Sequence, residues 1–344
     1  MKALVLEENA KLTYKDVPRP KRDNEDWVGV EVKAAGICGS DLHRGFEGGA
    51  YHVPLIMGHE FSGVVDDVSP GGEFKQGDRV IVFPLLWCGK CSACQTGDYA
   101  LCSGYSYYGS RRDGGFAEYV YVPERNLLKI PDHVDIVHAA MCEPAAVALH
   151  GVRQMRIQPG ATGAVLGGGP IGNMVAQWLR ISGCRKVFVI DLDEEKLTVA
   201  ERMGFVPVSG RDCDPVAAIK DATAGHGADK VVEAVGLPAT FLQAIQVAAS
   251  FGEVVFMGNI TGTFSVGEKD FSSILRRELT IHGTWNSKWT PRGLDDWSTA
   301  MAFMDRELTV APLISHTPPL SEGVEVFDAV YNRKIRYSKV IFTI

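Results

Sequence analysis

Four of the eight cysteines lie together in the stretch CGKCSACQTGDYALC. They are Cys88, Cys91, Cys94 and Cys102. Thiolates at this spacing can converge on one tetrahedral zinc, and a site with four cysteine ligands is closed to substrate. The stretch is rich in Gly, Ser and Gln and has little apolar surface to bury, so we expect a structural zinc to hold it together. Two disulfides, or four free thiols, are the alternatives.

A second set of potential zinc ligands is spread over three segments, AAGICGSDLH, PLIMGHEFSGVV and AAMCEPAAVALHG. These segments supply Cys38, His59, Glu60 and Glu143. A thiolate, an imidazole and a carboxylate together make an open zinc site, with a position left for water or substrate. Each residue alone is a weak signal, because a lone cysteine is often a buried thiol and an acid before proline can mark a helix bend.

A glycine-rich turn in the middle of the chain has the context that a dinucleotide site requires. An apolar run at 164–166 leads into G-x-G-x-x-G and then into a segment with one apolar face. The glycines are Gly167, Gly169 and Gly172. They let the backbone approach a pyrophosphate, which the start of the following helix attracts.

The apolar run after this helix ends in an acid, Asp191, placed 19 residues after Gly172. An acid at the end of the second strand binds the ribose hydroxyls of NAD and repels the 2′-phosphate of NADP. The sequence therefore favours NAD over NADP as the cofactor.

Alternating strand and helix signals continue after this turn. Strands are predicted at 229–236, 252–258 and 278–285, and helices at 194–203 and 239–250. This order predicts an α/β doubly wound parallel sheet of the Rossmann type.

The first 140 residues have a different pattern. Four segments alternate polar and apolar residues, or run apolar, between turn residues. They are 27–36, 61–68, 78–84 and 116–123. The pattern predicts a β-rich unit of barrel type.

Composition narrows the class of protein. The 344 residues are 46% hydrophobic and 22% charged, with a formal net charge of −7. This length suits two domains, and the acidic balance argues against nucleic acid or an anionic membrane as a partner. The apolar run at the N-terminus is too short for a signal peptide. We therefore expect a reducing cytoplasm, where clustered cysteines are typically metal ligands.

Together these stretches resemble the zinc-containing medium-chain alcohol and polyol dehydrogenases, over nearly the whole chain. The landmarks are GICGSDLH, GHEFSG, GDRV, the four-cysteine lobe, GGFAEY, CEPAAVALHG, GGGPIG and VID. The resemblance implies a GroES-like catalytic domain at 1–144, a Rossmann NAD-binding domain at 145–284 and a return to the first domain at 285–344. It also implies a homodimer or homotetramer.

Carried over by position, the catalytic zinc ligands are Cys38, His59 and Glu143. An acid at position 143 resembles the polyol branch, since the alcohol dehydrogenases proper have cysteine there. Glu60 matches a carboxylate near the metal, which is an alternating ligand or holds the zinc-bound water; the alternative is an ion pair. Asp41 matches a partner that orients a ligand histidine.

The resemblance also implies the reaction. Zinc acts as a Lewis acid on a secondary alcohol, and a hydride passes to the nicotinamide of NAD. Ser40 and His43 match a proton relay to solvent, although in isolation both would be ordinary turn residues. Lys196 matches a position near the adenine ribose, where the alternative is a helix lysine that faces water.

The resemblance implies that the substrate is a polyol or a polyol phosphate. A phosphate would need cationic side chains, and planar guanidinium groups suit it well. The candidates are Arg44, Arg111, Arg112, Lys288 and Arg292. Asp113 could instead neutralise either of its two arginine neighbours. The alternatives are an unphosphorylated substrate (sorbitol, L-iditol or L-threonine), a zinc-free reductase and a non-catalytic protein on the same fold.

Overall fold

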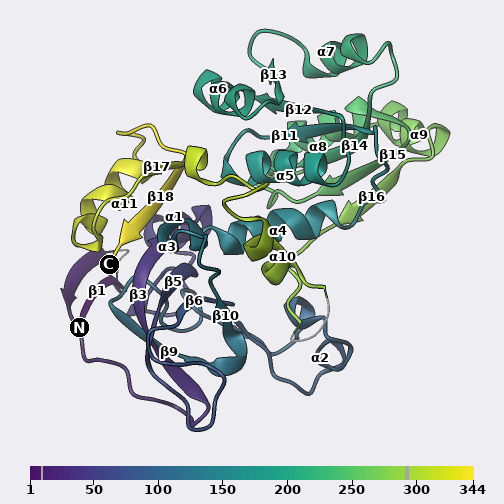
Figure 1. Ribbon diagram of the computed structural model, residues 1–344. Coiled ribbons are helices and arrows are strands. Elements are labelled where there is room, and N and C mark those ends of the chain that lie inside the picture. The colour runs from purple at the N-terminus through teal and green to yellow at the C-terminus, as the bar shows by residue number, and fades with distance from the viewer. Residues whose placement is uncertain (9–10, 291–293) are drawn as a thin grey trace. The chain divides into compact units, whose positions relative to one another are not determined.

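The computed structural model describes residues 1–8, 11–290 and 294–344 (Figure 1). The chain divides into two compact units. The first contains Met1–Pro144 and Lys288–Ile344, and the second contains Ala145–Ser287. The chain passes from the first unit to the second within α4 (Cys142–Val152). No helix in the described part of the chain is long and apolar enough to cross a lipid bilayer.

The first unit is β-rich, as its alternating segments predict. Its large sheet has the order β10-β6-β5-β3-β18-β17, and β9 also pairs with β3. A smaller sheet has the order β2-β1-β4, and β7 pairs with β8. The strands are β1 Lys2–Glu7, β2 Lys11–Asp16, β3 Trp27–Gly36, β4 Leu55–Ile56, β5 Glu60–Asp67, β6 Arg79–Val82, β7 Leu85–Leu86, β8 Ser106–Tyr107, β9 Tyr119–Pro123, β10 Leu127–Lys129, β17 Ile314–His316 and β18 Lys339–Thr343.

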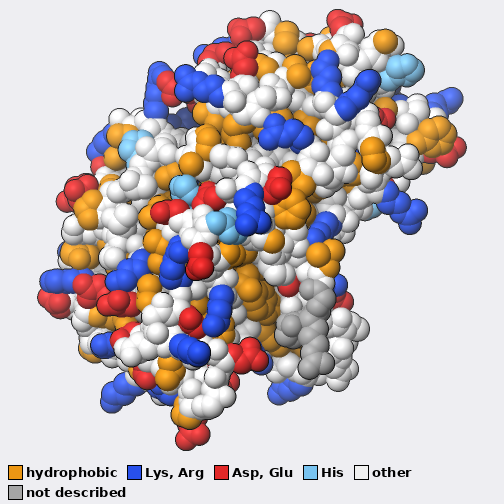
Figure 2. Space-filling view, viewed as in Figure 1, with side chains coloured by type: hydrophobic (Ala, Val, Ile, Leu, Met, Phe, Trp, Pro, Cys, Tyr) orange, Lys and Arg blue, Asp and Glu red, His pale blue; other side chains and the backbone are white. Residues whose placement is uncertain are grey.

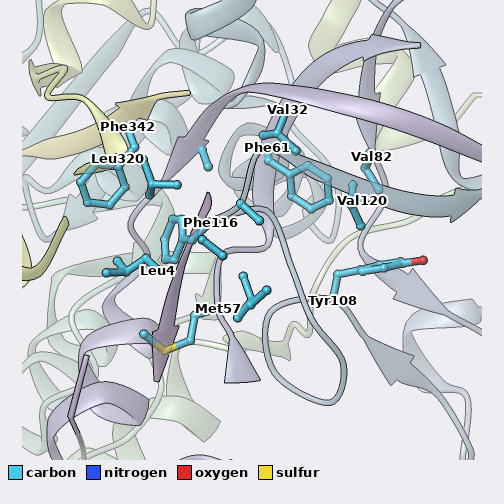
Figure 3. Packing of buried hydrophobic residues seen from close by; sticks show 14 of the residues in the cluster. Leu4, Val32, Met57, Phe61, Val82, Tyr108, Phe116, Val120, Leu320 and Phe342 are labelled. Atoms are coloured by element: carbon cyan, nitrogen blue, oxygen red, sulfur yellow. The ribbon is translucent and has the colours of Figure 1, made fainter. Parts of the chain in front are cut away.

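The long strand β3 runs through the core of this unit. It pairs antiparallel with β5, β9 and β18, and most of its side chains are buried. Leu4, Phe61, Phe116 and Phe342 belong to the same buried cluster, in which the rings of Phe116 and Phe342 meet edge to face at 5.5 Å (Figure 3). Burial of this apolar surface fixes where β3, β5 and β18 end.

Short helices connect these strands. Two of them begin with an aspartate cap, in which Asp135 accepts from Val137 N at 2.7 Å and Asp295 accepts from Ser298 N at 2.8 Å. The α-helices are α1 Gly39–Phe46, α2 Ser92–Thr96, α3 Ile136–Ala139, α10 Asp296–Phe303 and α11 Gly323–Tyr331. Single 3₁₀ turns are η2 Tyr99–Leu101, η3 Glu124–Asn126, η4 Ala311–Leu313 and η5 Leu320–Glu322.

The second unit confirms the predicted doubly wound parallel sheet. Its strand order is β13-β12-β11-β14-β15-β16, and every pairing in it is parallel. The strands are β11 Thr162–Leu166, β12 Lys186–Asp191, β13 Val206–Ser209, β14 Ala228–Glu233, β15 Ala248–Phe256 and β16 Thr280–Gly283. The helices after α4 are α5 Pro170–Ile181, α6 Glu194–Arg202, α7 Pro215–Ala222, α8 Pro238–Val247 and α9 Glu268–Arg276.

Charged side chains of both signs lie next to one another on the surface. On the face shown in Figure 2, lysines and arginines are interspersed with aspartates and glutamates. Such mixing fits the modest net charge of −7.

Candidate active site

The pairing register of three strands gathers the candidate ligands of the second set. Gly36, at the end of β3, pairs with Glu60 of β5 and with Ile341 of β18. Cys38 follows two residues later as the N-cap of α1, and His59 directly precedes β5. A Cβ at position 36 would collide with Glu60 Oε2, so the close approach of this carboxylate requires glycine.

Cys38, His59 and Glu60 form a compact set of donors. Their ligand atoms all lie within 4.8 Å of one another, and both His59 and Glu60 are buried. Glu143, which the sequence predicts as the third ligand, is outside this mutually close set. It is also buried, its charge acts on that of His59, and its Oε1 accepts a hydrogen bond from the Tyr107 hydroxyl at 3.2 Å. The structure thus places the Glu60 carboxylate beside the cysteine and the histidine, and the buried Glu143 carboxylate where its charge acts on the histidine.

Asp41 lies behind the histidine, as predicted. Its Oδ1 is 3.6 Å from His59 Nδ1, and its Oδ2 accepts from the backbone N–H of Cys38 at 3.0 Å. Burial lowers the pKa of His59, but the Asp41 carboxylate and the Cys38 thiolate outweigh burial and leave this pKa well above its ordinary value. The imidazole therefore sits where positive charge is stabilised.

Glu60 forms an ion pair, one of the roles expected for it, with a partner that the sequence does not single out. Lys339, the first residue of β18, binds its Oε2 through Nζ and also donates to the Ile37 carbonyl at 2.8 Å. Lys339 is buried, with 5% of its surface exposed. Burial lowers the pKa of Lys339, but the charges of Glu60 and Cys38 outweigh burial and raise this pKa above its ordinary value.

Glu143 has the most perturbed carboxyl group of this cluster. Burial, together with the nearby charge of Glu60, raises its pKa to about 7 against the opposing effects of His59 and Lys339. A buried carboxyl group such as that of Glu143, placed near another acidic group, does not ionise easily without a further cation. The set of donors, its burial and its surplus of acidic groups fit a zinc ion held by Cys38, His59 and either Glu60 or Glu143.

The four-cysteine lobe fits a second zinc ion. Its four sulfur atoms lie within 4.8 Å of one another, and Cys94 Sγ is 3.9 Å from Cys88 Sγ and 3.5 Å from Cys91 Sγ. Four sulfurs about 2.3 Å from a tetrahedral zinc would be about 3.8 Å apart, whereas a disulfide needs about 2 Å. All four cysteines are free. Backbone N–H groups of Cys94 and Ser103 lower the pKa of Cys91 to about 6, which favours the thiolate that zinc requires.

An aromatic ring directly before this lobe packs on a ring inside it. Trp87, just before Cys88, stacks on Tyr99 with ring centroids 4.2 Å apart. The Arg125 guanidinium covers the same indole at 4.2 Å. The Trp87 indole therefore links Tyr99 of the lobe to Arg125 of the first unit.

The residues of the predicted proton relay lie on α1. Ser40 Oγ accepts from Arg44 Nη1 at 3.1 Å, and the same Nη1 donates to Asp41 Oδ1 at 3.0 Å. His43 is exposed, and its Nδ1 is 2.8 Å from Glu47 Oε2. Within the described residues no direct hydrogen bond joins Ser40 to His43, so the structure places the two residues on one helix without linking them.

The glycine-rich turn lies between β11 and α5, as predicted. Gly167 follows the strand with φ +108°, and Gly169 is the N-cap of the helix. A Cβ at Gly172 would overlap the carbonyl oxygen of Gly167, so only glycine lets the helix pack this close to the strand. The turn can hold a pyrophosphate at the start of α5.

Asp191, at the end of β12, reaches back to this turn. Its Oδ2 accepts from Gly168 N at 2.7 Å, and its Oδ1 accepts from Leu192 N at 2.7 Å. Lys196 Nζ, on α6, lies 3.7 Å from the same Oδ2. Asp191 thus both shapes the turn and presents an acid where a nucleotide ribose would bind.

The cations proposed for a phosphate differ in their pairing. Arg44 is engaged with Asp41, and Arg112 Nη2 is 2.6 Å from Asp23 Oδ2. Asp113 pairs with neither arginine neighbour in the described structure, since its Oδ1 accepts from Ile56 N at 2.9 Å. Lys288 and Arg111 are exposed. Arg292 lies outside the described residues.

Family models match both units. The alcohol dehydrogenase GroES-like domain matches residues 24–132, and the zinc-binding dehydrogenase family matches residues 170–306. The chain belongs to the zinc-dependent alcohol and polyol dehydrogenases. It is therefore an enzyme of this dehydrogenase family, and its donor clusters lie in a protein of a zinc-binding class.

Named relatives of this dehydrogenase act on several substrates. Galactitol 1-phosphate 5-dehydrogenase of Escherichia coli K12 is 32% identical over 92% of each chain. L-threonine 3-dehydrogenase of Bacillus velezensis is also 32% identical, over 99% of this chain and 98% of its own. Sorbitol dehydrogenase of Bacillus subtilis is 35% identical over 75% of each chain.

Solved structures share the whole fold. Galactitol-1-phosphate dehydrogenase from Escherichia coli superposes with a TM-score of 0.93 at 30% identity and covers all of both chains. A zinc-binding dehydrogenase from Sinorhizobium meliloti, bound to NADP, superposes with a TM-score of 0.91 at 32% identity and covers 100% of this chain and 99% of its own.

Proposed function

We propose that this dehydrogenase oxidises a secondary alcohol of a polyol phosphate, with galactitol 1-phosphate as the substrate and a keto-sugar phosphate as the product. The similarity to galactitol-1-phosphate dehydrogenase, which extends over both chains, carries this proposal. The buried donor set of Cys38, His59 and two carboxylates supports it, because a metal held there serves alcohol oxidation.

The residues take distinct roles in this reaction. Cys38, His59 and Glu143 hold the zinc, with Glu60 beside it, and Asp41 orients His59. Zinc bound there would act as a Lewis acid that lowers the pKa of the reacting hydroxyl. Ser40 accepts a hydrogen bond from that hydroxyl, and His43 passes the proton to solvent. The carbon loses its hydrogen as a hydride to NAD, so the alcohol loses two electrons and the cofactor gains them.

NAD is the cofactor that we propose, bound at Gly167, Gly169 and Gly172. The Asp191 carboxylate, only 13% exposed on its side chain, would repel a 2′-phosphate. Lys196 is the nearby group that could soften this repulsion, since its ammonium is 3.7 Å from Asp191 Oδ2. The structural neighbour that binds NADP makes this choice worth testing directly.

Cys88, Cys91, Cys94 and Cys102 hold a second, structural zinc, so the proposed stoichiometry is two zinc ions per chain. The sulfur spacing described above supports this role. Thiolate ligation on this scale suits a reducing compartment, and we propose the cytoplasm.

The enzyme assembles as a homo-oligomer through the second unit. Strand β16 lies at one edge of the sheet, and among the described strands only β15 pairs with it. Phe271, Leu275 and Trp285 lie near it in sequence and are each more than half exposed. Apolar side chains beside a strand edge favour a second copy of the chain over water. Light scattering that finds a monomer would contradict this assembly.

A substrate panel tests the proposed reaction. Reduction of NAD is followed with galactitol 1-phosphate, galactitol, sorbitol and L-threonine under identical conditions. We expect kcat/KM for the phosphate ester to exceed that of each unphosphorylated substrate by at least about tenfold. If kcat/KM for L-threonine or a free polyol equals that for the phosphate ester, the proposed phosphorylated substrate is wrong. The chain is then a dehydrogenase of that other substrate.

A further inference from the structure

Arg111 is an exposed arginine whose guanidinium is held between two tyrosine rings. Its Cζ is 4.6 Å from the ring centroid of Tyr51 and 4.4 Å from that of Tyr105. Its Nη1 donates to the Tyr105 carbonyl at 3.3 Å and its Nη2 to the Tyr51 hydroxyl at 3.5 Å. These contacts restrict the side chain while the group keeps its full charge.

No carboxylate among the described residues lies within ion-pair distance of Arg111. Its neighbour Arg112 is bound to Asp23 at 2.6 Å, and Arg44 is bound to the buried Asp41. The adjacent acid, Asp113, is occupied by the backbone of Ile56. Of the three arginines, Arg111 is therefore the one whose guanidinium fork is left for an anion from solution.

A series of ring contacts leads from Arg111 to the candidate metal centre. The Tyr105 ring meets the Tyr107 ring at 6.3 Å, and the Tyr107 ring meets the His59 ring at 5.7 Å. Tyr107 also donates to Glu143. The guanidinium is thus separated from His59 by two ring residues, all within the first unit. An elongated substrate with its alcohol at the metal centre could reach Arg111 with its other end.

We infer that Arg111 is a specificity-determining residue, which binds the phosphate of the substrate at the end remote from the reacting alcohol. This inference rests on the proposed function and adds the residue that selects the substrate. A guanidinium already restricted by its contacts with Tyr51 and Tyr105 loses little side-chain entropy when it binds phosphate through two N–H groups. The binding energy comes from a group that does not react, far from the hydride.

A cavity of about 560 Å³ offers the other possible place for an anion. Arg111, Arg112 and Lys21 line it, together with Asp23 and Asp113, whereas neither His59 nor Glu143 does. An anion bound to Arg111 in this cavity would not compete with substrate at the metal centre. Competition between inorganic phosphate and the phosphate ester therefore distinguishes a substrate site at Arg111 from an unrelated anion site in the cavity.

Three variants test the inference with galactitol 1-phosphate and free galactitol. Arg111→Ala should lower kcat/KM for the phosphate ester by about 10²-fold and change that for galactitol by less than about threefold. Arg111→Lys should retain part of the activity on the ester, because it keeps the charge without the fork. Arg112→Ala is the matched control and should keep the wild-type preference. Inorganic phosphate should compete with the ester in the wild type and lose this effect in Arg111→Ala.

The outcomes distinguish the inference from the proposed function. If both the wild type and Arg111→Ala prefer the phosphate ester over galactitol, the proposed role of Arg111 is wrong. The proposed function is not affected by this result. Inorganic phosphate that binds without competing also overturns it, in favour of the cavity. A wild type without preference for the ester contradicts the proposed function itself. If Arg111→Ala does not fold, Arg111→Gln and Arg111→Lys give the same comparison.

Discussion

Lys339 and Glu60 form a buried ion pair that ties the last strand of the chain to the candidate metal centre. Both side chains are at least nine-tenths buried, and the lysine also binds the Ile37 carbonyl. A buried carboxylate that loses the cation bound to it is strongly destabilised, because water cannot replace that cation. The pair therefore fixes the position of Glu60 at the edge of the site.

Removal of this cation should be costly. We expect Lys339→Met to lower the free energy of unfolding by about 3–5 kcal/mol in urea titrations. Lys15→Met, which breaks the exposed pair with Glu7, is the control and should change stability little. The double variant Lys339→Met with Glu60→Gln should regain much of the loss. Equal stability of Lys339→Met and the wild type would show that the pair is unimportant.

Zinc should reverse the pH dependence of stability around the catalytic site. The pKa of Glu143, about 7, lies above its ordinary value of 4.5, and the pKa of His59 is also raised. In protein stripped of metal, both groups therefore add stability at low pH that is lost as pH rises through their folded pKa values. Zinc needs its ligands deprotonated, so the loaded enzyme should gain stability over the same range.

Thermal melts between about pH 5 and about pH 8 measure this reversal. We expect the melting temperature of the stripped wild type to fall across this range, and the fall should be smaller in Glu143→Gln. Zinc uptake by the stripped wild type should also release protons, which calorimetry in buffers of different ionisation enthalpy counts. Identical pH profiles with and without zinc would contradict the assignment of this site.

Removal of one thiol from the four-cysteine lobe should cost the protein the structural zinc and thermal stability before it affects the catalytic site. Cys91→Ser should lower the zinc content from near two to near one per chain and lower the melting temperature. Because Trp87 stacks on Tyr99 within the lobe, its fluorescence should change with the loss of metal. Cys213→Ser, at an exposed cysteine, is the control. A Cys91→Ser protein that keeps two zinc ions would show that the lobe binds none.

Asp191 should set the preference for NAD, which we expect to exceed about tenfold over NADP in kcat/KM. Asp191→Ala removes the repulsion of the 2′-phosphate, but it also removes the acceptor of Gly168 N. Activity with NAD should therefore fall further than activity with NADP rises. Asp191→Asn keeps an acceptor and should narrow the preference at a smaller loss. A wild type that uses both cofactors equally well would contradict the role of this acid.

Much of the fold could be predicted because the two units have different periodicities. Alternating segments mark β3, β5, β6 and β9, and the turn at Gly167 marks the start of the parallel sheet. Helix ends were harder. The helix predicted at 239–250 ends at Val247 in the structure, and β15 begins at the next residue. The apolar residues there suit either a helix or a strand. The short strand β13 and the helices α7 and α9 were not predicted from the sequence.

The candidate site was predictable only where residue types are distinctive. Cysteines, histidines and acids in short motifs point to Cys38, His59 and the four-cysteine lobe. Lys339 was missed, because a single lysine before an apolar strand is usually exposed. Tyr51 and Tyr105 were also missed as partners of Arg111, since contacts between loops have no local sequence signal. The register of β3, β5 and β18 brings Lys339 to Glu60, and no spacing in the sequence encodes it.

Zinc content and turnover of Cys38→Ser test the catalytic assignment most directly. The purified wild type should contain near two zinc ions per chain and reduce NAD with galactitol 1-phosphate. Cys38→Ser should keep the wild-type fold by circular dichroism, contain near one zinc ion and lose at least about 10³-fold in kcat, because removal of a ligand costs the Lewis acid. A Cys38→Ser enzyme with full turnover would show that catalysis does not depend on zinc at this site.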